Sequence, residues 1–230
     1  GMNEDLNKFF RRQKAQNDSN NAILEIQSDW LSLGHIDEIV TFCKIGGREK
    51  LLIAAPQEAM AIWLKSGTAW AQEANNTIAN ALTQAKYEQE DISDADWNKT
   101  IKQYNEELWT NHLANIEAAL PAQVGLTDQD VIRIPVVFFP FPTGGKALAF
   151  IYPNRVNLLV RGEGAFIVGD RTDFGNPVLV DVLRVKVAER LGNILTNSFI
   201  LSRHLTRDGG DVHCGTNAVR SGPINKEWAR

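Results

Sequence analysis

The shortness of its apolar runs is the feature of this sequence that most constrains the fold. In the second half of the chain, four such runs are bounded by Gly, Pro or Asn, and they cover residues 131–139, 147–151, 156–160 and 165–168. Runs of this length and punctuation are typical of β-strands. The most apolar stretch, Ile134 to Phe141, is interrupted by Pro135 and Pro140, and no apolar run reaches the roughly 18 residues that a membrane-spanning helix needs. The sequence therefore predicts no membrane span.

Helical patterns separate these short strands. Apolar residues at helical spacing predict helices over residues 3–16 and 178–191. Between residues 56 and 120 the composition shifts to Ala, Gln, Glu and Lys, which predicts two or three helices. One of them starts with a proline at its first position, and another is capped by Ser93 or Asp94. The tryptophans of this stretch follow apolar stripes and are expected in the core: Trp63, Trp70, Trp97 and Trp109.

Strand–strand–helix–strand order is repeated along the chain. Further strands are expected at residues 22–27, 39–45, 51–55 and 194–201. Residues 39–45 and 51–55 are joined through Gly46-Gly47-Arg48-Glu49, a connection typical of a β-hairpin. The expected fold class is α/β, or α+β with short sheets, in a single domain over residues 1–230.

Charge and cysteine content narrow the function and the compartment. The chain has 24 Lys and Arg against 28 Asp and Glu, a net charge of −4 and a pI near 5.6. This balance argues against nucleic-acid binding, which usually requires a clear basic excess. Two cysteines in 230 residues make no disulfide framework, and no signal-peptide pattern is visible. We therefore expect a reducing compartment, the cytoplasm.

The strongest chemical signal is the segment Asp208-Gly-Gly-Asp211-Val-His213-Cys214-Gly-Thr-Asn217. Cys214 is flanked by glycine and polar residues, unlike the apolar setting of a structural cysteine. Glycines let the backbone approach a ligand closely, and a neighbouring cation would favour the nucleophilic thiolate. An incidental surface cysteine is the alternative interpretation. Cys43, in an apolar strand, is expected to be a small core residue.

A second signal is Gly34-His35-Ile36-Asp37-Glu38, at the entrance of the following strand. In an extended segment, His35 and Asp37 project to one face. An imidazole beside a carboxylate suits proton transfer to a cationic substrate, whereas a solvated His and Asp on a loop is the alternative. A metal site shared with the Cys214 segment is a third interpretation, but the spacing fits no zinc pattern and we predict none. His112 is expected on a helix surface or half-buried.

Several motifs in the right order resemble the protein-arginine deiminase family. They are Ser28-Asp-Trp-Leu-Ser-Leu-Gly-His35-Ile-Asp37-Glu38, Gly125-Leu-Thr127 with Val131-Ile-Arg-Ile-Pro135, Pro153-Asn-Arg-Val-Asn157-Leu-Leu-Val160, and Val212-His-Cys214-Gly-Thr-Asn217. The resemblance runs from about Leu6 to Arg230 and is weakest between Lys65 and Leu120.

The resemblance implies a pentein fold, an α/β propeller of five ββαβ blades. It also implies hydrolysis of peptidyl-arginine, in an arginine-containing protein or peptide, to peptidyl-citrulline and ammonia through a cysteine thiouronium intermediate. Cys214 matches the nucleophile, His35 the general acid/base, and Asp37 one of two carboxylates that hold the guanidinium. Arg207 matches, with a one-residue shift, an arginine that holds the substrate backbone.

The family's first carboxylate and its main calcium ligands lie upstream of the segment that matches Leu6. We therefore expect no cofactor in this chain, although the family binds calcium. We expect about three of the five blades, a helical insertion near residues 56–120, and weak or no activity from the chain alone, whether it is a cut piece or a naturally short protein. An incomplete propeller leaves open sheet edges, which predicts a homodimer. An agmatine deiminase-like hydrolase of small guanidines and an inactive pentein module that binds arginine-bearing partners are the alternatives.

Overall fold

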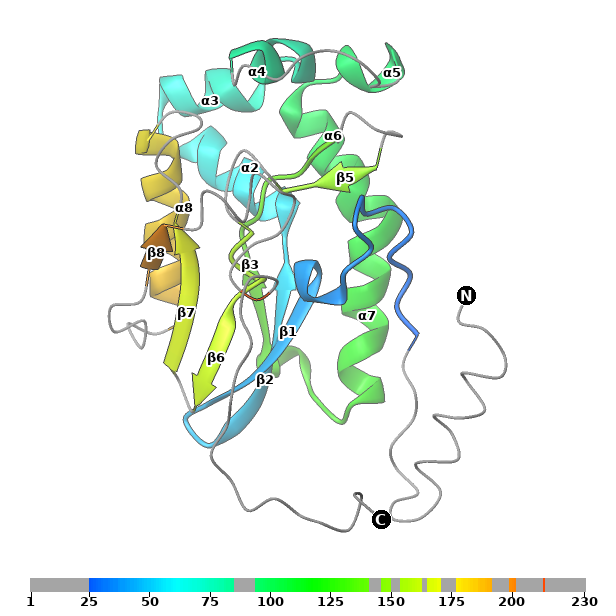
Figure 1. Cartoon of the computed structure of the whole chain (residues 1–230), viewed down its shortest axis with the longest axis vertical. Coiled ribbons are helices and arrows are strands. Elements are labelled where there is room, and N and C mark those ends of the chain that lie inside the picture. The colour runs from blue at the N-terminus through cyan, green and yellow to red at the C-terminus, as the bar shows by residue number, and fades with distance from the viewer. Residues whose placement is uncertain are drawn as a thin grey trace.

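The computed structural model describes residues 25–84, 94–140, 146–149, 154–162, 165–170, 177–191, 199–201 and 213. Over these residues the chain is a mixed α/β structure of helices and small sheets, and none of the described sheets closes into a barrel (Figure 1). The expected α/β class is confirmed, whereas the propeller stays a prediction. In the described part of the chain, no helix has both the length and the apolar character to cross a membrane.

The first sheet contains three strands in the order β1-β2-β3. β1 (Val40–Ile45) and β2 (Arg48–Ala54) form an antiparallel hairpin, and β3 (Val131–Ile134) lies parallel to β2. Gly46 and Gly47 make the two-residue turn with positive φ angles of 59° and 76°, a conformation open to glycine at no steric cost. The hairpin expected from the sequence is confirmed, with a shorter loop.

A second sheet has the same topology. β6 (Leu159–Gly162) and β7 (Ala165–Asp170) are antiparallel, α8 (Pro177–Arg190) follows, and β8 (Phe199–Leu201) pairs in parallel with β7. Each sheet is therefore a ββαβ unit, in which a helical connection leads from the second strand to a third strand parallel to it. β6 lies beside β1, and α8 lies beside α2 (Figure 1).

The helical stretch between β2 and β3 is the connection of the first unit. Its described elements are α2 (Pro56–Lys65), α3 (Thr68–Ala74), α4 (Ile78–Gln84), α5 (Asp94–Trp97), α6 (Ile101–Leu108), the π-helical turn η2 (Trp109–Leu113) and α7 (Ala114–Gln123). Pro56 begins its helix as expected, but the stretch holds more than the two or three helices expected. Local signals divide it: Gly67, with φ of 127°, precedes α3, and Thr100 caps α6 in a capping box with Gln103.

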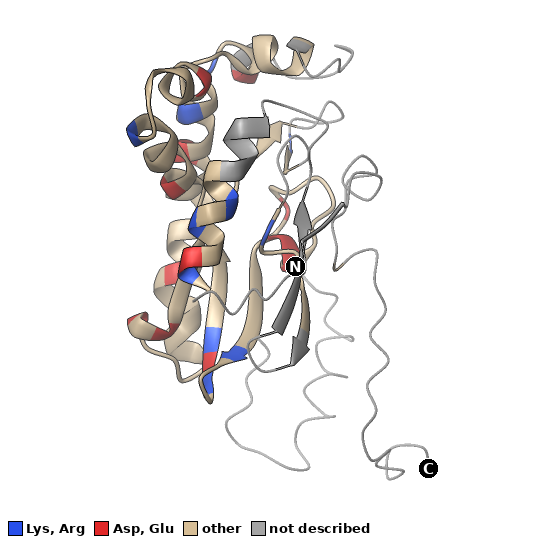
Figure 2. Cartoon of the chain, turned by 90° about the vertical axis from the view of Figure 1, so that its left-hand side faces the viewer, with Lys and Arg blue, Asp and Glu red and all other residues tan. Residues whose placement is uncertain are grey.

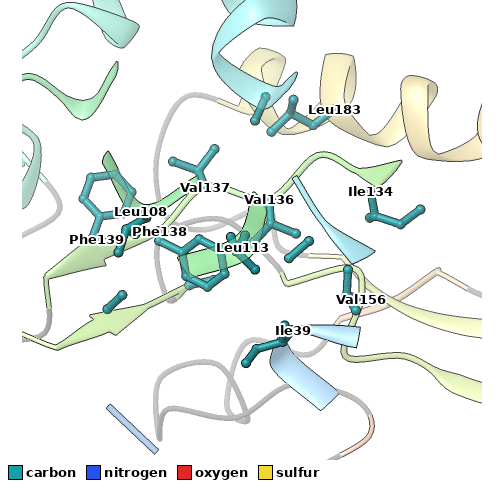
Figure 3. Packing of buried hydrophobic residues seen from close by; sticks show 14 of the residues in the cluster. Ile39, Leu108, Leu113, Ile134, Val136, Val137, Phe138, Phe139, Val156 and Leu183 are labelled. Carbon is teal, nitrogen blue, oxygen red and sulfur yellow. The ribbon is translucent and has the colours of Figure 1, made fainter. Parts of the chain in front are cut away.

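Helices and strands bury a continuous apolar core (Figure 3). Of the tryptophans expected there, Trp63, Trp70 and Trp97 are buried, and Trp109 is partly buried. Figure 3 shows Ile39, Leu108 and Leu183 around the segment from Val136 to Phe139. Burying a side chain of this size stabilises the fold by roughly 1.5–3 kcal/mol relative to exposure.

The apolar run 131–139, expected as one strand, is divided in the structure. β3 ends at Ile134, before Pro135, which has no N–H to continue the ladder. The backbone of Phe138 pairs instead with the buried Asn105 side chain, whose Oδ1 accepts from the Phe138 N–H at 2.8 Å while its Nδ2 donates to the Phe138 carbonyl at 3.0 Å. The chain then continues as β4 (Phe139–Pro140), which pairs with β5 (Ala147–Leu148).

Other expectations are met in part or lie outside the described residues. Residues 25–27 of the expected strand 22–27 are not in a strand. The strand expected over 194–201 is confirmed for Phe199–Leu201. The helix expected over 3–16 lies outside the described residues, as does Ser93, and α5 begins at Asp94.

Charged side chains of both signs are interspersed along the helices and the hairpin (Figure 2). Arg190 of α8 pairs with Glu58 of α2. Arg133 of β3 pairs with Glu117 of α7, Nη2 to Oε1 at 2.5 Å, and its Nε lies 3.8 Å from Glu58 Oε1. This network ties the helix of the second ββαβ unit to the first unit.

Candidate functional site

The residues from Gly34 to Glu38 form a tight turn immediately before β1. Gly34 has a φ of 68°, and Ile36–Glu38 is the 3-10 helix η1. The extended geometry considered for this segment is therefore wrong, because the positive φ of Gly34 redirects the chain into a turn. In the turn His35 is exposed, and the Asp37 side chain keeps 20% of its surface exposed.

Residues 154–158 form a buried loop beside this turn, which we call the strap. All five are at most 3% exposed. Asn154 Nδ2 donates to the Glu38 carbonyl at 2.9 Å, and Thr41 Oγ1 on β1 donates to the Val156 carbonyl at 2.7 Å. These bonds satisfy buried polar groups and hold the strap against the turn and β1.

The strap explains why the strand expected over 156–160 begins late. The Val156 N–H donates to Asn154 Oδ1 at 3.1 Å, and the Asn157 N–H donates to the Asn154 carbonyl at 3.0 Å. A local side-chain acceptor thus competes with the sheet for the backbone. β6 starts only at Leu159.

Asp37, Asn157 and His213 meet where the turn adjoins the strap, and we call them the Asp37 cluster. His213 Nδ1 lies 2.8 Å from Asp37 Oδ2, and Asn157 Nδ2 donates to the same oxygen at 3.1 Å. The backbone N–H of His213 donates to Asn157 Oδ1 at 2.9 Å. Asn157 stands 120 positions from Asp37 and 56 from His213, so only the tertiary fold brings the cluster together.

Two of the expected site residues are described and two are not. His35 and Asp37 lie in one turn, whereas Cys214 and Arg207 lie outside the described residues. Cys214 is bonded to His213, and consecutive Cα atoms are about 3.8 Å apart. The contact between His213 and Asp37 brings His213, the residue that precedes Cys214 in the chain, to the turn.

Asn157 and His213 were not among the expected site residues, although both lie in motifs of the family resemblance. A signal was present, because Asn154 and Asn157 interrupt an apolar run, and buried amides require hydrogen-bond partners. The sequence did not show which groups these partners are, because the contact between Asn157 and Asp37 spans 120 positions.

Comparison with known proteins identifies the family. The family model described as "Protein-arginine deiminase (PAD)" matches residues 1–229. The chain belongs to the protein-arginine deiminase family. It is similar to protein-arginine deiminase type-4 of Homo sapiens, with 31% identity over 99% of this chain and 33% of that protein. It is also similar to type-1 of Mus musculus, with 27% identity over 96% of this chain and 31% of that protein, and to type-3 of Rattus norvegicus, with 28% identity over 96% and 32%.

The family membership confirms the resemblance expected from the motifs. The chain spans about a third of the length of the curated deiminases it matches. The matches are to deiminases named for protein arginine, and they do not favour the alternative of a small-guanidine hydrolase. Two motifs of the resemblance, around His35 and around Asn157, are the turn and the strap of the structure.

Cys43 of this deiminase-family chain has the properties of a core residue. It is a free cysteine on β1 and is 4% exposed, as expected. Burial, with a smaller effect of Glu49, raises the pKa of the Cys43 thiol to about 11. At neutral pH it is therefore almost entirely protonated and a poor nucleophile.

Trp30, which precedes the turn in the chain, packs against the helical stretch. Its ring stacks on His112 of η2, with centroids 5.1 Å apart and 9° between the planes, and meets Phe138 edge-on. His112 is half-buried, as expected, and burial lowers its pKa despite the opposing effect of Asp29. Two cavities of about 160 and 210 Å³ adjoin His112, one along α7 and the other along α6.

The described residues supply no metal site. Within them, no group of three or more His, Cys, Asp and Glu side chains is arranged to hold an ion.

Proposed function

We propose that this chain carries the nucleophile, the general acid/base and one guanidinium-binding carboxylate of a peptidyl-arginine deiminase. The observation that carries the proposal is the 2.8 Å contact between His213 Nδ1 and Asp37 Oδ2. It brings His213, the residue bonded to Cys214, to the turn that carries His35 and Asp37. This contact supports the proposal, because a thiol, an imidazole and a carboxylate are the groups that this hydrolysis needs.

Asp37 is proposed to bind the guanidinium of the substrate arginine. A guanidinium is a planar cation that a carboxylate holds through two parallel hydrogen bonds. Asn157, a contact of this carboxylate, is an uncharged amide and orients it without neutralising its charge. Held in this way, the guanidinium carbon is fixed in front of the Cys214 sulfur, and positioning supplies much of the rate.

The reaction then follows in two steps. The Cys214 thiolate attacks the guanidinium carbon and forms a C–S bond, and His35 protonates the departing nitrogen, so that the C–N bond breaks and ammonia leaves. His35 next removes a proton from water, and the resulting hydroxide attacks the thiouronium carbon. The C–S bond breaks and the thiolate is restored, while the adduct's hydroxyl group loses its proton to solvent or to the released ammonia and becomes the carbonyl of peptidyl-citrulline. Arg207 is proposed to hold the substrate backbone.

The finer features of the fold and the assembly are proposals of the same kind. The pentein propeller is supported by the shared ββαβ topology of the two described units. A homodimer is supported by exposed apolar side chains, among them Phe42 on β1 at 45% and Val185 on α8 at 53%. Light scattering at micromolar concentration should give about twice the chain mass of 25.6 kDa, and a clean monomer contradicts the dimer. The expectation that this chain holds no cofactor, although the family binds calcium, and its cytoplasmic location stay predictions.

The chemical proposal is tested by measuring how Cys214 reacts with an amidinium electrophile. 2-Chloroacetamidine carries a planar cation like that of arginine, whereas iodoacetamide is neutral. Mass spectrometry of the Cys214 peptide gives both alkylation rates, and their ratio reports recognition of the cation. We expect a ratio higher than that of a free-cysteine peptide. Ammonia release from benzoyl-arginine ester and from agmatine is measured in parallel, with Cys214→Ala as the blank.

Equal ratios for the protein and the peptide contradict the assignment of this site to guanidinium chemistry. They favour instead the inactive module considered from the sequence. Faster ammonia release from agmatine than from the blocked arginine ester contradicts the protein-directed substrate class. Turnover that survives in Cys214→Ala contradicts the assigned nucleophile.

A further inference from the structure

His213 contacts the Asp37 cluster at two points. Its side chain meets Asp37 Oδ2 through Nδ1 at 2.8 Å, and its backbone N–H donates to Asn157 Oδ1 at 2.9 Å. Asn157 closes the ring by donating to Asp37 Oδ2 at 3.1 Å. An ionised carboxylate only accepts hydrogen bonds, so a hydrogen bond to the ionised form of Asp37 requires the proton on Nδ1.

His213 and its partner Asn157 differ in how firmly the fold holds them. Asn157 is fully buried, and the strap that contains it is bonded to the turn through Asn154 and the Glu38 carbonyl. The His213 side chain, in contrast, is 53% exposed. A half-exposed imidazole contributes little to core packing, so its contact with Asp37 is the property that a substitution mainly removes.

We propose that His213 is a positioning residue that orients the Asp37 carboxylate toward the guanidinium and ties it to the Cys214 backbone. This inference rests on the proposed function of Asp37 and Cys214. Two hydrogen bonds to one carboxylate oxygen restrict rotation of the carboxylate plane. His213 is also the residue bonded to Cys214, so the same side chain sets the carboxylate relative to the nucleophile. A misplacement of about 1 Å in such a site costs up to about a hundredfold in rate.

The test compares His213→Ala with His213→Asn in the full chain. The amide nitrogen of asparagine occupies nearly the place of Nδ1 and can donate the same hydrogen bond, whereas alanine cannot. The readout is the ratio of Cys214 alkylation by 2-chloroacetamidine to alkylation by iodoacetamide. This ratio cancels any change in the thiol itself, which matters because the substitution adjoins Cys214.

We expect His213→Ala to lower the ratio about tenfold, as for the loss of one hydrogen bond to a charged group, and His213→Asn to restore most of it. His112→Asn, the same change at a histidine outside the cluster, should leave the ratio unchanged. Thermal unfolding of each variant by circular dichroism checks that the fold persists.

Asp37→Asn separates this inference from the proposed function. If Asp37→Asn lowers the ratio and His213→Ala does not, the positioning role is wrong while the function of Asp37 stands. If Asp37→Asn leaves the ratio unchanged, the proposed function fails, and the inference that rests on it fails as well. If both lower it, the double variant should lose no more than Asp37→Asn alone, because the two residues act through one contact. Additive losses contradict that coupling. An equal loss in His213→Asn and His213→Ala contradicts the role of the hydrogen bond to Asp37.

Discussion

Asp37 and Asp130 are both bound by several side chains, but their partners differ in kind. Asp130 Oδ1 lies 2.7 Å from Arg48 Nη2 and 2.8 Å from Lys50 Nζ, while its Oδ2 accepts from Thr127 Oγ1 at 2.7 Å. Asp37 is contacted instead by an amide and an imidazole, 120 and 176 positions away. The cations at Asp130 come from the neighbouring strand β2, and its hydroxyl partner lies three residues before it.

This difference in partners distinguishes Asp130, a structural carboxylate, from Asp37, a carboxylate suited to binding a cation. Lys50 above all, then Thr127, holds the pKa of Asp130 well below its ordinary value, so its charge is already used inside the fold. Of the two partners of Asp37, Asn157 is an uncharged amide, and His213 supplies a positive charge only when it is protonated. A carboxylate of the second kind is the one that an incoming guanidinium can pair with.

The largest effect is expected between the two thiols. Cys43 is buried, and its pKa is raised to about 11, whereas an unperturbed thiol has a pKa of about 8.5. At neutral pH the thiolate fractions then differ by roughly a hundredfold or more, before access is counted. Labelling with limiting iodoacetamide should modify Cys214 first, as read by peptide mass spectrometry. Equal labelling of both, or preference for Cys43, contradicts the nucleophile assignment.

The next largest effect is expected for Asp37→Asn. Losing a charge-assisted pair should lower the chloroacetamidine-to-iodoacetamide ratio about ten- to a hundredfold, with little change in thermal stability. Asp130→Asn is the matched control, because it makes the same chemical change at the structural carboxylate. It should leave the ratio unchanged. If the two variants behave alike in this assay, the distinction between the carboxylates is lost.

Asp130→Asn should lower the thermal stability of the chain, by an amount that depends on pH. Because the folded pKa of Asp130 is depressed, its contribution is complete above the ordinary value and is lost as the pH falls below it. At pH 7 the variant should unfold roughly a few degrees lower than the natural chain. Between about pH 5 and pH 2 the two melting curves should converge. A difference in Tm that persists or grows in acid excludes this account.

The smallest effect is expected at His112. Burial lowers its pKa, so the unfolded chain binds its proton more readily than the folded chain does. Stability should therefore rise slightly with pH through the range around the ordinary value of 6.5. His112→Phe keeps a ring that can stack on Trp30 and removes the titration, which should flatten this slope. Urea unfolding at pH 5 and pH 8 measures it, and an unchanged slope would mean that another group is responsible.

Local structure followed from the sequence wherever a few adjacent residues decide the backbone. The hairpin at Gly46-Gly47, the helix start at Pro56 and the helix α8 were predicted because φ preferences, a missing N–H and apolar spacing act within one turn. The strands that were wrong in extent failed where a distant or buried side chain took a backbone group, as Asn105 does at Phe138. The number of helices in the 56–123 stretch was also wrong, because short caps such as Thr100 were not recognised.

The sequence by itself determined the family, the α/β class and the residue types of the candidate chemistry, since these are carried by short motifs and local preferences. Only the tertiary structure decided that the 34–38 segment is a turn, that the strap lies against it, and that Asn157 and His213 meet at Asp37. The physical reason is that hydrogen bonds across 120 and 176 positions leave no periodicity in the chain. They form only when burial of the strap and the sheets offsets the entropic cost of closing such long loops.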